Sequence, residues 1–182
     1  NNLIAGNYIG VDRIGTKAVA NTYHGIFLDF DNQSNIIGTN GDGINDTAER
    51  NIIASNSLNG ITLSTDELGD DGNTPDNNRI SGNTISTNEV NGILDQGNNT
   101  IIDSNYITAN VVDGIQFGPY ADNASVFANL IGELSDGTAA GNGDDGINIR
   151  KRNAGHIIGG SDDQANVIKN NAVGIRVESD LS

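Results

Sequence analysis

Short apolar segments recur along the chain, and the dipeptide Gly-Ile opens each of them. The six dipeptides begin at Gly25, Gly60, Gly92, Gly114, Gly146 and Gly174. In five of the six segments, the first and third residues after the glycine are apolar. This two-residue period is typical of a β-strand with one buried face. No segment has the three- and four-residue spacing of an amphipathic helix over a dozen residues, so the pattern predicts an all-β protein.

A second motif precedes these segments. Six asparagines share one environment, with an aliphatic residue three positions before and another two positions after: Asn7, Asn56, Asn83, Asn105, Asn129 and Asn171. Asn83 and Asn105 are 22 residues apart, as are Gly92 and Gly114, and Asn88 maps onto Asn110 within the same unit. Fixed strands separated by insertions of variable length indicate a solenoid. We expect the recurring asparagines to stack, each amide bonding to the coils above and below.

Parallel strands of successive coils, about 4.8 Å apart, would stack isoleucine on isoleucine in one core. The chain has 24 isoleucines, 24 glycines and 29 asparagines, and the last two residue types tolerate left-handed corners. We therefore predict a single domain over residues 1–182, a right-handed parallel β-helix of about six coils.

Two segments carry a family resemblance. NNLIAGNYIGVDRIGTKAVANTYHGIFL and NIIGTNGDGINDTAERNIIASNSLNGITL resemble repeats of bacterial secreted and cell-surface proteins of the pectin-lyase-like, right-handed parallel β-helix class. Both recur later in the chain, so the resemblance covers nearly all of it. The class includes polysaccharide lyases, hydrolases and epimerases as well as adhesins. The resemblance therefore implies an architecture without selecting an activity.

Charge excludes several partners. Nine lysines and arginines against 24 acids give a formal net charge of −15, which excludes a general nucleic-acid binder. No apolar run is long enough to insert into a membrane. The chain contains neither cysteine nor methionine, so thiolate metal sites are excluded and we expect a piece of a longer chain with neighbouring domains.

The resemblance implies a place for catalytic groups, since enzymes of this class carry carboxylates and a basic residue on the outer face of one strand ladder. In the Gly-Ile segments, charge concentrates on this face in the last two coils: Asp144, Asp145, Arg150, Lys151, Arg152, Arg176 and Glu178. Arg150 and Glu178 occupy the same column on adjacent coils, so the alternative is a set of surface ion pairs. His24 and His156 align with asparagines of other units and are expected to fill repeat positions.

Calcium and sugars are candidate ligands. Residues 38–49 read GTNGDGINDTAE and match part of a calcium-loop pattern at Asn40, Asp42, Asp46 and Glu49, although Gly38 stands where aspartate should be. Asp66, Asp70, Asp71 and Asp76 form a second acidic loop with weaker spacing. The rings of Tyr8, Phe27 and Tyr106 should point outward, where they could stack on sugars.

Asp95 departs from the pattern. Its column is otherwise apolar, with Leu28, Leu63, Phe117, Ile149 and Val177. A buried unpaired carboxylate is costly, so we expect this strand to end early and Asp95 to reach water.

Two functions remain open. The first is a structural or adhesive segment of a secreted or cell-surface bacterial protein, a rigid acidic rod that presents its loops to a glycan or protein partner. A polysaccharide or cell-surface glycan is the candidate partner, and calcium is the candidate cofactor. The alternative is a polysaccharide lyase, epimerase or hydrolase acting on uronate-containing polysaccharide. Proton abstraction beside a uronate carboxylate requires a base and a neutralising cation.

Overall fold

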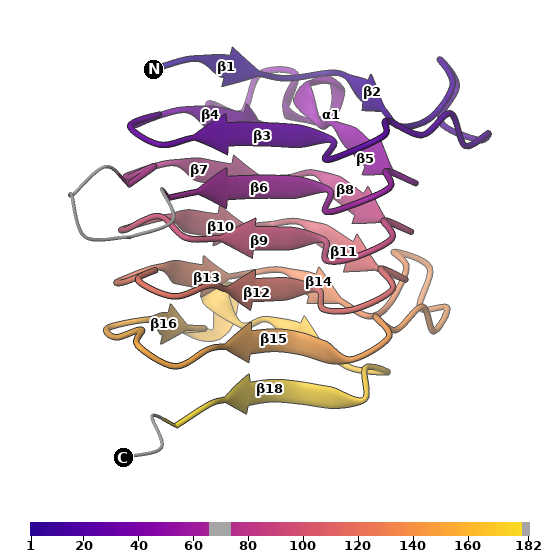
Figure 1. Cartoon of the computed structure of the whole chain (residues 1–182). Coiled ribbons are helices and arrows are strands. Elements are labelled where there is room, and N and C mark those ends of the chain that lie inside the picture. Colours follow the sequence, from indigo (N-terminus) through magenta and orange to yellow (C-terminus); the bar gives the residue numbers. More distant parts are fainter. Residues whose placement is uncertain (66–73, 180–182) are drawn as a thin grey trace.

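The protein is a stack of six coils, described by a computed structural model over residues 1–65 and 74–179. Each coil contributes one strand to each of three parallel six-stranded sheets (Figure 1). The predicted right-handed parallel β-helix of about six coils is confirmed. No helix among the described residues has the length and hydrophobicity needed to cross a bilayer.

The strands are short, and the insertions between them carry little regular structure. Sheet one contains β1 (Leu3–Ile4), β4 (Ile36–Gly38), β7 (Arg79–Ser81), β10 (Ile101–Asp103), β13 (Ser125–Phe127) and β16 (Ile157–Ile158). Sheet two contains β2 (Tyr8–Ile9), β5 (Ile52–Ala54), β8 (Thr84–Ser86), β11 (Tyr106–Thr108), β14 (Leu130–Ile131) and β17 (Val167–Ile168). Sheet three contains β3 (Ile26–Asp29), β6 (Ile61–Ser64), β9 (Ile93–Asp95), β12 (Ile115–Phe117), β15 (Asp145–Ile149) and β18 (Val173–Val177). The helix α1 (Asp46–Glu49) and the 3-10 turn η1 (Asp162–Gln164) lie in insertions.

All six Gly-Ile segments form sheet three, as their period predicts. The isoleucine after each glycine pairs in register with its equivalent on the next coil, for example Ile93 with Ile115. Side chains such as Ile107 and Ile115 are fully buried, and they belong to one core that runs through the stack. Burial of this apolar column is the main source of stability for the fold.

Close approach of the coils explains the glycine in the five Gly-Ile pairs at Gly25, Gly60, Gly92, Gly114 and Gly146. A Cβ atom added at Gly92 would lie 2.6 Å from the carbonyl oxygen of Gly114, and one at Gly114 would lie 2.6 Å from that of Gly146. No side chain tolerates such contacts with backbone, so glycine is required wherever the coils stack at this corner.

The asparagines form ladders, but the predicted grouping is wrong in part. The structure divides the six predicted residues between two ladders. The first runs through Asn7, Asn51, Asn83, Asn105, Asn129 and Asn166. The second runs through Asn21, Asn56, Asn88, Asn110, Asn142 and Asn171. Asn56 and Asn171 therefore stack at a different corner from Asn7, because local spacing alone does not identify the corner when insertion lengths vary.

A ladder asparagine is expected to contribute strongly to stability. Asn105 Oδ1 accepts hydrogen bonds from the backbone N–H and the Nδ2 of Asn83 at 2.9 and 3.1 Å, and its own Nδ2 donates to Ile80 O at 2.9 Å. Since Asn105 is buried, Asn105→Ala leaves these partners unpaired, and we expect a loss of about 2 kcal/mol in the free energy of unfolding. Chemical denaturation measures it. Asn21→Ala, at the exposed end of the other ladder, should cost less than about 0.5 kcal/mol; equal losses would contradict the ladder as a stabilising element.

Asp95 corrects a second expectation. It is the last residue of β9, pairs in register with Leu63 and Phe117, and is fully buried rather than exposed to water. Its Oδ1 accepts hydrogen bonds from the backbone N–H of Gly97 at 2.8 Å and from the Thr100 hydroxyl at 3.2 Å, while its Oδ2 has no partner among the described residues. Burial is the main reason that the pKa of Asp95 rises from 3.8 to about 7.

Candidate functional site

The charged residues predicted on sheet three do come together, mostly as ion pairs. The guanidinium of Arg176 contacts Asp145 with Nε–Oδ2 at 2.5 Å and Nη2–Oδ1 at 2.9 Å, and it lies 3.6 Å from Asp144. The hydrogen bonds to Asp145 are the main reason that the pKa of Arg176 is raised. Arg150 and Glu178 lie 3.8 Å apart. Lys151 and Arg152 are exposed, and Arg152 Nη1 donates to the hydroxyl of Tyr120 at 2.9 Å.

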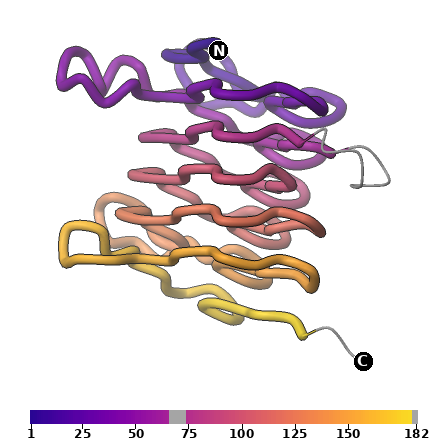
Figure 2. The backbone as a smooth tube through the Cα atoms, turned by 90° about the vertical axis from the view of Figure 1, so that its left-hand side faces the viewer, coloured from indigo at the N-terminus to yellow at the C-terminus, as the bar shows by residue number. Residues whose placement is uncertain are grey.

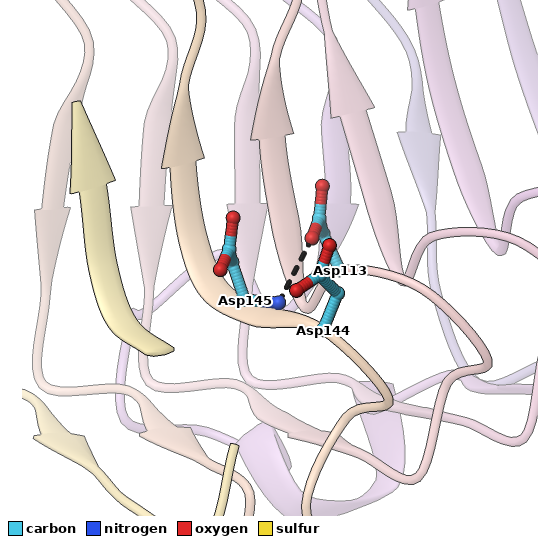
Figure 3. A group of neighbouring side chains, drawn as sticks. All are labelled: Asp113, Asp144 and Asp145. Atoms are coloured by element: carbon cyan, nitrogen blue, oxygen red, sulfur yellow. Dashed lines mark hydrogen bonds between the residues drawn. The ribbon is translucent and has the colours of Figure 1, made fainter. Parts of the chain in front are cut away.

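Asp113 joins this group, although the sequence reading did not select it. One carboxylate oxygen from each of Asp113, Asp144 and Asp145 lies within 4.8 Å of the other two (Figure 3). Asp113 Oδ1 accepts a hydrogen bond from the backbone N–H of Asp145 at 3.0 Å, and its Oδ2 accepts from Gln116 at 3.0 Å and Asn148 at 3.1 Å. Burial raises the pKa of Asp113 and outweighs these hydrogen bonds. The cluster is therefore internally paired, and Arg176 already neutralises much of its charge.

The loop predicted to bind calcium lies between β4 and β5. Its acidic side chains accept hydrogen bonds within the loop: Asp46 from the Thr39 hydroxyl at 2.8 Å, and Glu49 from the backbone N–H of Asn40 at 3.0 Å. Asp42 accepts from the backbone N–H of Ile44 at 2.7 Å and from Asn40 Nδ2 at 3.1 Å. Calcium binding by this loop stays a prediction.

The second acidic loop is only partly described. Asp66, Asp70 and Asp71 lie outside the described residues. Asp76 lies within them, and it accepts hydrogen bonds from the Thr74 hydroxyl at 2.5 Å and from the backbone N–H of Asn98 at 3.0 Å.

The two histidines make structural contacts. His156 precedes β16 as Asn35 precedes β4, and its ring stacks on Phe117 with centroids 4.3 Å apart. His24 stacks on Phe27 at 5.4 Å and shares a hydrogen bond with the Thr62 hydroxyl at 2.9 Å. Burial lowers the pKa of both histidines.

The three predicted sugar-binding rings lie in different surroundings. Phe27 is 50% exposed and, with Tyr23 and His24, lines a cavity of about 410 Å³ on the outer face of sheet three. Tyr8 is 49% exposed on β2, at the end of sheet two. Tyr106, on β11 of the same sheet, is half-buried and borders two further cavities.

Three adjoining cavities meet at Arg50, the residue that follows α1, and we call them together the Arg50 groove. They measure about 280, 330 and 450 Å³. Their lining includes Thr39, Asp46, Arg50, Arg79, Ser81, Thr84, Asp103, Tyr106, Leu130, Leu134, Asp136 and Val167. The insertion that carries α1 and the segment around η1 project from one side of the stack (Figure 2). The outer surface of sheets one and two forms the floor, and these insertions contribute to the walls.

Arg50 is held in a fixed orientation within this groove. Its Nε donates to the carbonyl oxygen of Gly82 at 2.7 Å, and its Cζ lies 4.8 Å from the centroid of the Tyr106 ring. Arg50 forms no ion pair with a carboxylate among the described residues. In a chain with 24 acids, an arginine in a cleft without a carboxylate partner leaves its two terminal nitrogens available for an anion.

The other arginine of the groove is already paired. Arg79 contacts Asp103 through Nε–Oδ1 at 2.9 Å and Nη2–Oδ2 at 3.0 Å, and the Ser81 hydroxyl also donates to Asp103 at 2.9 Å. The hydrogen bonds to Asp103 are the main reason that the pKa of Arg79 is raised. This pair is a locally neutral part of the groove floor, and Arg50 is the arginine of the groove that forms no ion pair among the described residues.

The sequence reading missed both Arg50 and Asp113. Asp113 could have been found, because it precedes a Gly-Ile pair as Asp145 does. Arg50 gave no such signal, since its partners Gly82 and Tyr106 are 32 and 56 residues further along the chain and Arg50 belongs to an insertion.

Comparison with solved structures confirms the architecture. The crystal structure of the periplasmic alginate epimerase AlgG aligns over 98% of this chain with a TM-score of 0.52 and 18% sequence identity. The two proteins share the parallel β-helix fold. Two variants of the same epimerase give TM-scores of 0.53 at 19% identity. The chain spans 39% of the length of these structures. No protein-family model and no curated protein matches the sequence.

Proposed function

We propose that this β-helix is a binding segment of a secreted or cell-surface bacterial protein, and that it binds a uronate-containing polysaccharide in the Arg50 groove. The observation that carries the proposal is an arginine in a cleft, in contact with the ring of Tyr106 and without a carboxylate partner in the part of the chain that the structure describes. A guanidinium binds a carboxylate through two parallel hydrogen bonds, and an adjacent aromatic ring supplies apolar contact for a sugar.

The net charge of −15 opposes an acidic ligand at long range. Arg50 acts at short range, where the neighbouring Arg79–Asp103 pair adds no net charge and the lining carboxylates of Asp46 and Asp136 add to the repulsion. Calcium held by the loop of Asn40, Asp42, Asp46 and Glu49, which forms one wall, would weaken the repulsion further. We therefore expect stronger binding when calcium is present.

Proton NMR of oligosaccharides mixed with the protein tests the proposal. Uronic-acid oligomers should broaden on addition of protein, whereas neutral oligomers of equal length should keep their line widths. Broadening of the uronic-acid oligomers should increase as monovalent salt is added at low ionic strength, because screening weakens the long-range repulsion from the chain of net charge −15 more than it weakens the direct contact with Arg50. Equal broadening for both oligomers, or none for either, would contradict the proposal.

The fold shared with an alginate epimerase favours a second candidate, catalysis on the same polymer. In this alternative, Arg50 would neutralise the uronate carboxylate, and Tyr106, after giving its hydroxyl proton to water, would take the proton from one face of the adjacent carbon. Water would then deliver a proton to the opposite face for epimerisation, or the bond to the leaving sugar oxygen would break for elimination. The same NMR samples in heavy water separate the two functions. Epimerisation replaces that proton by deuterium and elimination creates a vinyl proton, whereas a binding segment leaves every sugar signal in place.

A further inference from the structure

Charge is unevenly distributed over the three cavities that meet at Arg50. The largest, about 450 Å³, extends from Arg50 over β11, β14 and β17. Among the described residues that line this cavity, Arg50 alone is charged. Leu130 pairs in register with Tyr106 on one side and with Val167 on the other, so these side chains follow one outward-facing column of sheet two. The apolar lining consists of Tyr106, Ala128, Leu130, Ala165 and Val167.

A second carboxylate has no cation to bind in this largest cavity. Lys169 follows β17, but it is paired with Glu133 and does not line the cavity. Arg50 can form two parallel hydrogen bonds to one carboxylate only. A further carboxylate that entered the cavity would lose hydration against apolar side chains without gaining a partner, which is unfavourable. The cavity therefore suits an uncharged sugar.

The other two cavities carry negative charge beside Arg50. Asp46 lines the cavity of about 280 Å³, where Arg79 is already paired with Asp103. Asp136 lines the cavity of about 330 Å³. The backbone N–H of Thr138 donates to Asp136 at 2.9 Å and is the main reason that the pKa of Asp136 is lowered, so this carboxylate is ionised at neutral pH. A second carboxylate of the ligand would face a like charge in either cavity.

We infer that the Arg50 groove selects a polysaccharide in which each uronate is flanked by uncharged sugars, and that it disfavours a continuous polyuronate. The inference rests on the proposed function and adds the charge pattern of the ligand. Arg50 binds one carboxylate, and the apolar column beside it contacts the C–H face or an acetyl group of the neighbouring neutral sugar. Such a polymer also brings fewer carboxylates toward a chain of net charge −15.

Isothermal titration calorimetry with three hexasaccharides tests the charge pattern. One consists of glucuronic acid throughout, one alternates glucuronic acid with N-acetylglucosamine, and one consists of N-acetylglucosamine throughout. A chelator is present, so that calcium cannot bridge carboxylates of ligand and protein. The alternating hexamer should bind about 10-fold more tightly than the all-glucuronate hexamer, although it carries half as many carboxylates, because like charges brought together oppose binding. The neutral hexamer should bind most weakly.

A variant that adds a cation should remove this preference. Val167→Lys places an ammonium group at the largest cavity, and we expect about 10-fold tighter binding of the all-glucuronate hexamer, with the alternating hexamer changed less than about twofold. Val111→Lys is the matched control, since Val111 is 56% exposed and lines none of the three cavities. If Val167→Lys does not fold by circular dichroism, Asp136→Asn replaces it and should favour the all-glucuronate hexamer in the same way.

The outcomes separate this inference from the proposed function. If the all-glucuronate hexamer binds at least as tightly as the alternating one, uronate binding stands and the selection for charge pattern is wrong. Equal effects of Val167→Lys and Val111→Lys would also overturn the selection, because overall charge would then explain both. If neither uronate-containing hexamer binds more tightly than the neutral hexamer, the proposed function fails and the inference fails with it.

Discussion

Replacing Asp95 by asparagine is expected to make the protein more stable at pH 8 and to flatten the dependence of its stability on pH. Asp95 is fully buried, and one of its carboxylate oxygens has no hydrogen-bond partner within residues 1–65 and 74–179. Desolvation is the main reason that its pKa rises from 3.8 to about 7, with a smaller contribution from the charge of Asp76. The hydrogen bonds from Gly97 and Thr100 oppose this rise without cancelling it.

The direction of the pH effect follows from proton linkage. Between pH 3.8 and about 7 the folded protein keeps a proton on Asp95 that the unfolded chain has released, so stability falls as pH rises through this window. A pKa raised from 3.8 to about 7 lowers the free energy of unfolding by about 4 kcal/mol. The full decrease is reached at a pH where Asp95 is ionised in both the folded and the unfolded state. Above pH 7 this contribution stays constant.

Asp95→Asn removes the ionisation while its Oδ1 can still accept the bonds from Gly97 and Thr100. The new Nδ2 has no acceptor in place, which costs part of the gain, so we expect a net increase of about 2 kcal/mol at pH 8. Urea denaturation at several pH values between 4 and 8 measures this. Asp113 also has a raised pKa, so the free energy of unfolding of the variant should still fall with pH, with a smaller slope than in the wild type.

The exposed carboxylate of Asp29, in β3, provides the matched control, because Asp29→Asn removes the same charge from the surface. That variant should keep the wild-type slope. If Asp95→Asn retains the full pH dependence of the wild type, the buried carboxylate is not its source.

Arg50→Met should weaken binding of uronic-acid oligomers about 100-fold, which equals about 2.7 kcal/mol. Methionine keeps an apolar stem over the Tyr106 ring but removes every donor of the guanidinium. Arg50→Lys keeps the positive charge but cannot form two parallel hydrogen bonds to one carboxylate, and we expect its affinity for the oligomers to fall about 10-fold. Isothermal titration calorimetry with oligomers of fixed length measures both.

A second arginine–tyrosine pair supplies the control. Arg152 lies over the ring of Tyr120 with Cζ 5.9 Å from the centroid, in an exposed turn outside the Arg50 groove. Arg152→Met removes the same charge, and affinity should change less than about twofold. Equal losses for the two methionine variants would assign binding to overall charge instead of to the groove. Denaturation of each variant separates lost binding from lost folding, since Arg50 also bonds Gly82 O.

The sequence by itself determined the coil architecture. The Gly-Ile period located all six strands of sheet three. It also aligned Asp95 with Leu63 and Phe117, which is the register that the structure has. It succeeded because strand spacing within a coil and the requirement for glycine at a crowded corner are local properties. The same local spacing aligned His24 and His156 with asparagines of other units, and both histidines occupy those repeat positions in the structure.

Only the tertiary structure decided the rest. Asn56 and Asn83 have similar neighbours in sequence yet stack at different corners, because insertions change the number of residues per coil. Asp95 is buried because β9 continues to it and the following turn closes over its side chain through Gly97 and Thr100. The Arg50 groove combines residues of separate insertions with residues of two sheets, and no periodicity links Arg50 to the strand residues that it meets. Physical proximity between coils, rather than sequence spacing, brings Arg50 onto the ring of Tyr106.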